Sequence, residues 1–588
     1  MDYLNVVSLY EDLSKTSKRL EKTYLVSEFL RGIKKKDDVE ALLHLIRGKL
    51  FHSSDARKIG VSSQLVMKAL ARSSGHSLEE IEKKWSEIGD LGDVTEYFLS
   101  HKKQKTFFSD SLTVHKVYYH LRSLADLVGA GSVNKKLGLI SELLNSSAGK
   151  ESKYIVRIIL EDMRIGVADG TLRDALVWAF YVKVPYNVET KNLDMRGSLR
   201  EDYNAATARV QRAYDLNPDF GVLVRRILEE GKESIDSFSL EIGKPFHSML
   251  ALKVENAEEA LEAVGRPALC EYKLDGFRAQ IHKKGKKIFL FTRRLEEVSK
   301  AFAELIPVLE ERVKAKDFIL DCEIIGYDPF TKKYKPFQEI SQRIKRKHDI
   351  ESLAQKLPVE IQVFDVLALE GKDLMHYSQE ERRKILKRII HEKDFVLRIT
   401  EGKICHNTEE VEAFYQKALH AGHEGIMIKS LEKEYSSGRK VGGWVKLKPV
   451  LESLDLVIVG AEYGTGKRAG FLSSFLLAVR ENNNFLTCGM VGTGIKEKEE
   501  QESVSFSELT MLLKKDIIEE VGKKVVVKAK VIVEVNYEEL QKSPTYGSGY
   551  ALRFPRIVRL RTYDKSLKEI NTLQDLERIY KEQRGKTK

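Results

Sequence analysis

Residues 268–278 read ALCEYKLDGFR, an apolar run that ends in a Lys-x-Asp-Gly turn. The run predicts a strand, and Asp275 with Gly276 predicts a turn directly after it. Lys273 would then stand at the end of the strand, where its amine can point into a cleft. A buried lysine beside other cations loses its proton readily and becomes a nucleophile. The tetrapeptide alone occurs by chance in roughly one chain in ten of this length, where it forms an ordinary surface turn.

Downstream, charged or aromatic residues recur on segments that are otherwise apolar enough for a protein interior. Charges inside a protein are paired or serve a site, and a single segment of this kind could be a core strand with an exposed end. A series that alternates acid and base predicts one cleft holding a nucleotide and a metal ion. In chain order the segments are FTRR (291–294), DCE (321–323), VFDV (363–366), EGIMIK (424–429) and WVKLKP (444–449), with 321–323 and 363–366 expected at strand ends.

The character of the sequence changes twice, which divides the chain into three expected domains. Residues 1–237 carry apolar side chains at helical spacing and predict an all-α domain. Residues 238–449 mix strand patterns, hairpin turns and helices, which predicts an α+β domain around the Lys-x-Asp-Gly segment. Residues 450–588 read as short strands with glycine turns and one helix, which suits a small β-barrel of the OB-fold type.

One segment of the helical region contains a distinct turn. Within residues 153–180, Gly166 and Gly170 separate two helical runs, and Thr171 is the expected N-cap of the second run. The backbone N–H groups of such a turn could hold a phosphate, although an ordinary helical hairpin has the same pattern.

The composition limits the classes of function. The chain has 588 residues, with 99 Lys and Arg against 88 Asp and Glu, and its net charge of +11 makes nucleic acid the leading partner. A basic surface without such a partner explains the charge equally well. No uncharged apolar run is long enough to span a membrane, and the acidic N-terminal segment does not fit a signal peptide. The four cysteines form no CxxC pair, which argues against a zinc ribbon and indicates a reducing compartment.

Together, these segments resemble the motifs of the ATP-dependent DNA ligases of the archaeal and eukaryotic replicative type. KLDGFR (273–278) looks like the nucleotidyl-lysine motif, the later segments look like the motifs that follow it, and ALRFPRIVRLRTYDK (551–565) looks like the last motif. The helical first part resembles the DNA-binding domain of the family, so the likeness covers nearly the whole chain. Residues 441–443 read VGG where the family often has a more basic run.

The resemblance implies an enzyme that seals nicks in duplex DNA in replication, repair and recombination, using ATP and Mg²⁺. Lys273 would take AMP from ATP and pass it to the 5′-phosphate at the nick, and AMP would leave when the 3′-hydroxyl attacks. Lys446 and Lys448 would neutralise phosphate and lower the pKa of Lys273, while Glu323 and Glu424 would bind Mg²⁺ or accept from a ribose hydroxyl. The other expected nucleotide contacts are Glu271 and Phe364 at the adenine, Asp275, Arg278, Arg293 and Glu323 at the ribose or phosphates, Lys440 at the nucleotide, and Arg553 and Arg556 at the pyrophosphate.

Three alternatives share part of this pattern. RNA-capping and RNA-joining enzymes carry similar lysine motifs, but the long basic helical region favours duplex DNA. NAD-dependent ligases share Lys-x-Asp-Gly and usually add a four-cysteine zinc module, which this sequence lacks. A catalytically dead DNA-binding scaffold would not need the intact set of lysines and glutamates.

The expected partner is nicked double-stranded DNA, and the expected state is a monomer. We expect a cytoplasmic location, or a nuclear one if the source is eukaryotic. A sliding clamp is a further candidate partner, with QKTFF (104–108) as a loose match to a clamp-binding peptide. A loop tip with a buried phenylalanine pair explains that segment equally well.

Overall fold

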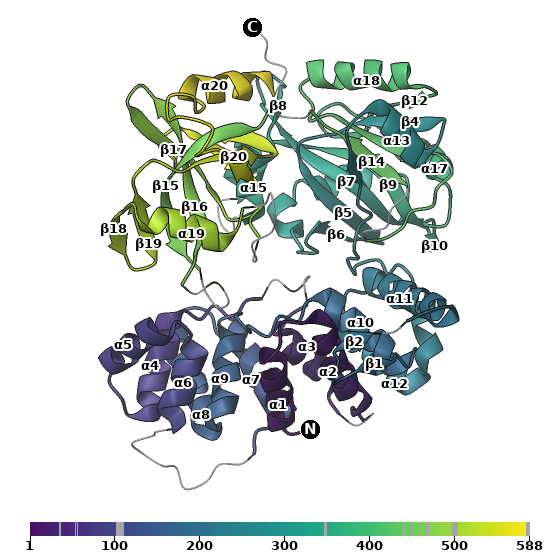
Figure 1. The fold of residues 1–588 in the computed structure, drawn as a ribbon. Helices are drawn as coiled ribbons and strands as arrows, with labels where there is room; N and C mark the ends of the chain where they lie inside the picture. Colours follow the sequence, from purple (N-terminus) through teal and green to yellow (C-terminus); the bar gives the residue numbers. More distant parts are fainter. Residues whose placement is uncertain are drawn as a thin grey trace. The chain divides into compact units, whose positions relative to one another are not determined.

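Figure 1 shows the fold of the chain in a computed structural model. The structure describes residues 1–34, 37–52, 55, 57–100, 111–193, 195–345, 350–438, 443–449, 452–464, 468, 470–496 and 504–583. Lys440 and the QKTFF segment lie outside the described residues. No helix in these ranges has the length and apolar character needed to cross a membrane.

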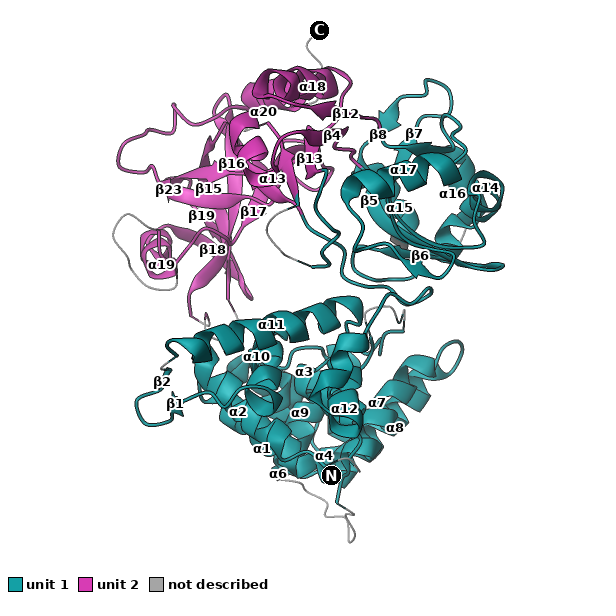
Figure 2. Cartoon of the chain, turned by 90° about the vertical axis from the view of Figure 1, so that its right-hand side faces the viewer, with its two compact units in different colours: residues 1–250, 276–400, 431–443 teal, residues 251–275, 401–430, 444–588 magenta. Residues whose placement is uncertain are grey.

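The chain divides into two compact units, which Figure 2 colours separately. Unit 1 comprises residues 1–250, 276–400 and 431–443, and unit 2 comprises residues 251–275, 401–430 and 444–588. The chain passes from unit 2 to unit 1 between Asp275 and Gly276, inside the Lys-x-Asp-Gly turn.

The N-terminal region of unit 1 is helical, as the sequence predicts. Several of its helices begin at side chains that accept from the backbone N–H groups of the first turn, such as Ser77 at α5 and Asp38 at α3. The elements are α1 Tyr3–Ser14, α2 Arg19–Arg31, α3 Val39–Arg47, α4 Ser63–Ser74, α5 Leu78–Ile88, α6 Leu91–Ser100, α7 Val114–Asp126, α8 Ser132–Ser146, α9 Gly149–Ile159, α10 Asp169–Phe180, the strands β1 Tyr186–Asn187 and β2 Asn192–Leu193, α11 Ser198–Leu216, α12 Phe220–Glu230 and the 3-10 helix η1 Lys232–Ser237.

The predicted N-cap of α10 is wrong. Because α10 starts at Asp169, Thr171 lies inside its first turn, where it is buried. The turn before α10 is instead held by a residue that is far away in the sequence, Lys22 of α2. Gly166 has φ +64°, the Nζ of Lys22 lies against it, and this amine donates to the carbonyl of Ile165. A local sequence pattern cannot show such a contact between α2 and the turn.

Unit 1 also contains a seven-stranded sheet with the strand order β10-β9-β7-β5-β6, in which β8 pairs with β7 and β11 pairs with β9. The strands are β5 Phe277–Lys284, β6 Lys287–Thr292, β7 Asp317–Tyr327, β8 Tyr334–Lys335, β9 Val359–Leu369, β10 Lys372–Asp373 and β11 Leu397–Ile399. The helices of this part are η2 Ser299–Phe302, α14 Leu305–Arg312, α15 Phe337–Lys345, α16 Ile350–Lys356 and α17 Gln379–Ile389.

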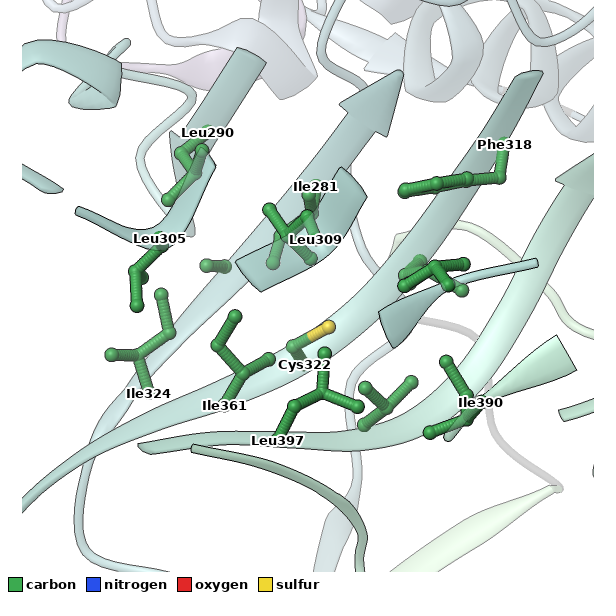
Figure 3. Close-up of a cluster of buried hydrophobic side chains, with 14 of the residues drawn as sticks. Ile281, Leu290, Leu305, Leu309, Phe318, Cys322, Ile324, Ile361, Ile390 and Leu397 are labelled. Atoms are coloured by element: carbon green, nitrogen blue, oxygen red, sulfur yellow. The ribbon is translucent and has the colours of Figure 1, made fainter. Parts of the chain in front are cut away.

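The two faces of this sheet differ in character. One face forms a hydrophobic core, in which Ile281 of β5 and Cys322 of β7 meet Leu309 of α14 (Figure 3). Since strand residues alternate between faces, Arg278 lies on the opposite face, directly across from Glu323 in the β5–β7 register. The polar segments of the sequence therefore mark one face of a buried sheet.

The expected positions of two polar segments along their strands are wrong. Asp321 and Glu323 lie in the middle of β7, and Phe364 lies in the middle of β9, where strand ends were predicted. Both strands have 11 residues and continue past the polar positions, because the residues that follow are again apolar and pair with neighbouring strands.

Unit 2 begins with a five-stranded sheet of order β12-β4-β13-β14-β3. β4 ends at Tyr272, so Lys273 follows the last strand residue, as predicted. In the register, Met427 pairs with both Glu271 and Lys446, which places these side chains on one face. The elements are β3 Leu252–Val254, α13 Ala257–Val264, β4 Ala268–Tyr272, β12 Gly402–Cys405, α18 Thr408–His420, β13 Ile426–Ser430 and β14 Trp444–Leu447.

The rest of unit 2 is the predicted strand-rich domain. β15 is bulged after Ile458, so its first half pairs with β20 and its second half with β19, and the sheet curves around one core. The elements are β15 Leu454–Tyr463, β16 Leu472–Glu481, β17 Asn484–Val491, α19 Phe506–Lys514, β18 Ile517–Val521, β19 Lys524–Val527, β20 Ile532–Asn536, β21 Glu539–Lys542, β22 Tyr550–Arg553, β23 Arg556–Leu560 and α20 Leu573–Glu582.

Candidate active site

Lys273 lies in a cluster of three charged side chains in unit 2, which we call the Lys273 cluster. Its Nζ lies 2.5 Å from Oε2 of Glu424, and the Nζ of Lys448 lies 2.9 Å from the same oxygen. These side chains are 21–24% exposed, so solutes can reach them. The backbone fixes the cluster, because Lys273 N donates to the carbonyl of Gly425 and Glu424 N donates to the carbonyl of Lys273.

The charges of this cluster set the starting state of the lysine. Burial raises the pKa of Glu424, but Lys273 and Lys448 outweigh this effect and lower it to about 2. Glu424 is therefore an anion at neutral pH and favours the ammonium form of Lys273. The charge of Glu424 therefore opposes the expected effect of Lys448 on Lys273.

A second ion pair lies on the same sheet. The Nζ of Lys429 is 2.5 Å from Oε2 of Glu271, both side chains are 1% exposed, and the amine lies 4.3 Å from the ring centroid of Trp444. The sequence pointed to Glu271 but not to Lys429 as a site residue. The alternation of side chains along a strand could have indicated it. Lys429 comes two residues after Met427 in β13 and so lies on the same face of the sheet as Met427 and its partner Glu271.

In unit 1, Arg278 belongs to a buried polar network that we call the Arg278 cluster, with Asp321 and Tyr435. The guanidinium binds the Asp321 carboxylate through two bonds of 2.9 and 2.6 Å, and it also donates to the carbonyl of Met249 at 2.6 Å. Burial would lower the pKa of Arg278, but Asp321 and Tyr435 outweigh it and raise it. The guanidinium fork expected to grip phosphate or ribose therefore holds Asp321 in this structure.

The other expected contacts of unit 1 lie near the same strands. The Phe364 ring centroid lies 5.4 Å from the Arg278 guanidinium, and the partly exposed Glu323 lies across from Arg278. Arg293 is exposed in the turn after β6. In unit 2, Asp275 and Lys446 are both partly exposed.

The two barrel arginines flank an exposed turn. Nη1 of Arg553 donates to Oε2 of Glu539 at 3.1 Å, and its guanidinium lies 5.3 Å from the ring of Phe554, which is 65% exposed. Arg556 is exposed at the first residue of β23. Both arginines can therefore reach a ligand in solution.

Comparison with known proteins identifies the family. The chain is 43% identical over 588 residues to the DNA ligase of Nanoarchaeum equitans (strain Kin4-M), covering 100% of this chain and 99% of that protein. It is 37% identical over 583 residues to the DNA ligase of Thermococcus onnurineus (strain NA1), covering 99% and 98%. Residues 248–448 match the family model of the ATP dependent DNA ligase domain. The chain belongs to the ATP-dependent DNA ligases.

The rest of the chain agrees with this family. Residues 2–177 match the DNA ligase N terminus, and residues 468–565 match the ATP dependent DNA ligase C terminal region. A solved structure named Pmar-Lig_PreS3 has the same fold, with a TM-score of 0.54 and 17% identity, covering 94% of this chain and 99% of that one.

Membership of this family settles the class of reaction. DNA ligases of this type use ATP and join the 3′-hydroxyl and 5′-phosphate ends at nicks in duplex DNA, through lysine–AMP and DNA–adenylate intermediates. The full-length identity to DNA ligases decides against the RNA-joining enzyme and the inactive scaffold.

An Mg²⁺ ion at this site would be expected to take oxygen ligands from the substrate as well as from the protein. Within the described ranges, no group of three or more His, Cys, Asp and Glu side chains could hold a metal ion. Glu323 of unit 1 and Glu424 of unit 2 each carry a partly exposed carboxylate with hard oxygens, and Mg²⁺ commonly completes its shell with phosphate oxygens and water.

We expect Gly425→Ala to slow self-adenylation of this ligase by about a hundredfold, the cost of an ångström-scale misplacement of reacting groups. Gly425 has φ +138°, and a Cβ would lie 2.2 Å from the carbonyl oxygen of Leu447. The backbone next to Lys448 must then move away from Glu424 and Lys273. The measurement is the rate of covalent labelling with α-labelled ATP.

Gly422→Ala is the matched control for this variant. Gly422 has φ +82° but no atom within 4 Å of a Cβ, so the substitution adds backbone strain without displacing the Lys273 cluster. It should label at a rate close to wild type. Equal rates for the two variants would mean that the packing of Gly425 against Leu447 does not position the lysine.

Proposed function

We propose that Lys273 is the residue that carries AMP in this ligase. The observation that supports it is the Lys273 cluster, in which an accessible lysine is held at the end of β4 beside Glu424 and a second cation, Lys448. In the first step the Lys273 amine attacks the α-phosphorus of ATP, a nitrogen–phosphorus bond forms, and the bond to the β-phosphate oxygen breaks. Pyrophosphate leaves with the electron pair, and the amine loses a proton to solvent.

The later steps return the lysine to its starting state. The 5′-phosphate at the nick attacks the lysine–AMP phosphorus, which releases Lys273 and forms the DNA–adenylate. The 3′-hydroxyl then attacks the 5′-phosphate, and AMP leaves. Such transfers depend mainly on positioning and on neutralising charge.

We assign the remaining residues of the nucleotide site by their chemistry. Lys446 and Lys448 neutralise phosphate oxygens, and Glu271, paired with Lys429, accepts from the exocyclic amine of adenine. Phe364 stacks on the base. The other proposed contacts are Asp275, Arg278, Arg293 and Glu323 at the ribose or phosphates, and Lys440 at the nucleotide.

We assign Glu323 and Glu424 as Mg²⁺ ligands. Bound there, Mg²⁺ would neutralise phosphate charge as a Lewis acid. Engagement of Glu424 in this way would weaken its hold on the Lys273 ammonium and favour the neutral amine.

A direct test of nucleotide choice uses α-labelled ATP, GTP and NAD in parallel, each incubated with the protein and Mg²⁺. Only the ATP label should remain on the protein after denaturation. Retention of the GTP label would instead point to an enzyme of the RNA-capping kind.

For DNA, we propose that the helical region holds a nicked duplex through its backbone, and that the ligase acts as a cytoplasmic monomer. We keep 1–237, 238–449 and 450–588 as the proposed domain limits. A sliding clamp remains a candidate partner.

We expect Arg553→Ala combined with Arg556→Ala to slow the first step about a hundredfold, because these arginines are proposed to contact pyrophosphate, which exists only in that step. Sealing of pre-adenylated nicks should stay within a fewfold of wild type. The control is Arg559→Ala with Arg578→Ala, which removes two exposed arginines of the same domain, and it should leave self-adenylation unchanged. Equal losses in both steps would show that the barrel arginines serve another purpose.

A further inference from the structure

Tyr435 places a buried hydroxyl at the centre of the Arg278 cluster. The residue is 3% exposed, and its hydroxyl makes three hydrogen bonds. It donates to Oδ2 of Asp321 at 2.8 Å, and it accepts from Nη2 of Arg278 at 3.1 Å and from the backbone N of Met249 at 3.0 Å. One hydroxyl thus joins four segments of the chain that are far apart in sequence.

We infer that Tyr435 is a positioning residue that holds the Arg278 guanidinium in the orientation in which it meets the nucleotide. This inference rests on the proposed contact of Arg278 with ATP. Asp321 fixes one edge of the guanidinium through two bonds, but a carboxylate can rotate about its own side chain. The Tyr435 hydroxyl bonds to Asp321 and Arg278 at once, so neither can turn without breaking a bond to the tyrosine.

Tyr435 is itself rigidly placed. Its backbone N donates to the carbonyl of Met375 at 2.9 Å, and the Arg382 guanidinium lies 5.8 Å from its ring centroid. Arg382 is in turn locked by two bonds to Asp365, and both of these side chains are fully buried. The hydroxyl therefore has little freedom to follow a moving partner.

The same network holds the segment that follows the helical region and precedes β3. Met249 is held at both ends, since its carbonyl accepts from Arg278 and its N–H donates to Tyr435. Phe246 comes three residues before Met249, and Gln280 of β5 binds both its N–H and its carbonyl. Arg278 and Gln280 lie on the same face of β5, so the segment is bound along that face and Tyr435 completes its attachment beside Arg278.

The test replaces only the hydroxyl. Tyr435→Phe keeps the ring and leaves Asp321, Arg278 and the N–H of Met249 each with one bond fewer. We expect the ATP concentration that half-saturates self-adenylation to rise about tenfold, the usual size for a lost bond to a buried charged group. The maximal rate should change less than about twofold, since a ribose or phosphate contact made equally before and during reaction affects binding alone.

Tyr154→Phe is the matched control. Tyr154 is also fully buried, and its hydroxyl donates to a carboxylate, Oε1 of Glu11, at 2.7 Å in the helical region. Both variants should unfold at a slightly lower temperature than wild type. Only Tyr435→Phe should change the half-saturating ATP concentration. Equal thermal shifts with unchanged ATP dependence would mean that Tyr435 is merely structural and would overturn the inference.

A double-variant experiment tests whether Tyr435 acts through Arg278. Arg278→Lys keeps a positive charge for Asp321 but removes the fork, and it should itself raise the half-saturating ATP concentration. Adding Tyr435→Phe to it should then change the value less than about twofold, because the two residues serve one contact. Additive effects, or an unchanged value for Arg278→Lys, would overturn the inference. Labelling of wild type together with its loss in Lys273→Ala would leave the proposed function standing in either case.

Discussion

Replacing Lys273 with alanine is expected to abolish both self-adenylation and the sealing of unmodified nicks. The phosphoramidate needs an amine at this position, and the neighbouring Lys448 amine comes from a different strand end and is held on Glu424. Sealing of a pre-adenylated nick should survive in part, because the last step uses no lysine nucleophile. The measurements are covalent labelling with α-labelled ATP and nick sealing on the two substrates.

The fold should tolerate this change. Glu424 keeps Lys448 as a partner after Lys273 is removed, so no buried charge is left without a counterion. The control is Lys417→Ala, which removes an exposed lysine paired with Glu401 in the same unit and should label as well as wild type. If the Lys273→Ala protein still carried the AMP label, another residue would have to carry the nucleotide.

A truncated protein that starts at residue 238 is expected to lose at least about a hundredfold in affinity for nicked DNA and to bind with a weaker salt dependence. Each phosphate contact that disappears lowers the slope of log affinity against log salt by about one unit. The helical region is proposed to supply several such contacts, including those of the turn at 166–171. The measurement is nick affinity at several salt concentrations for the full-length and truncated proteins.

Self-adenylation provides the folding control for the truncated protein. All proposed nucleotide contacts lie beyond residue 238, so labelling with ATP should persist. The cut removes Asp215, whose backbone carbonyl accepts from the N–H of His247 and whose carboxylate lies 3.2 Å from the imidazole. A modest loss of thermal stability is therefore expected. Unchanged affinity and slope would mean that the helices do not bind the DNA.

The sequence was sufficient for the family, the three-part fold and the placement of Lys273 after a strand. These features depend on local signals, since a polar residue at the end of an apolar run marks a strand end and a site together. The predicted strand ends at 321–323 and 363–366 were wrong, because in the sequence a polar residue inside a buried strand looks the same as one at the end of a strand.

The partners of the site residues required the structure. Arg278 and Asp321 are separated by 42 residues that a local pattern cannot bridge, and they meet only because β5 and β7 pair in a particular register. Lys429 reaches Glu271 for the same reason on the other sheet. Tyr435 gave no signal at all, since a lone tyrosine outside a strand is unremarkable until its hydroxyl is seen among charged groups.

The need for glycine at position 425 was equally hidden. The sequence placed Gly425 within EGIMIK, but only the structure shows its positive φ and the carbonyl of Leu447 pressed against it. The same holds for Gly276, where a Cβ would lie 2.4 Å from the carbonyl oxygen of Ile324. Both glycines are required by contacts between strands, which no single segment encodes.

Peptide mapping by mass spectrometry can locate the AMP group that Lys273 is proposed to carry. The wild-type protein is incubated with ATP and Mg²⁺ without DNA, digested under conditions that preserve the phosphoramidate, and fragmented to locate the added mass. We predict one AMP group, on Lys273, which disappears when nicked DNA is added. AMP on any other residue, or a wild-type protein that carries none, would contradict the assignment of Lys273.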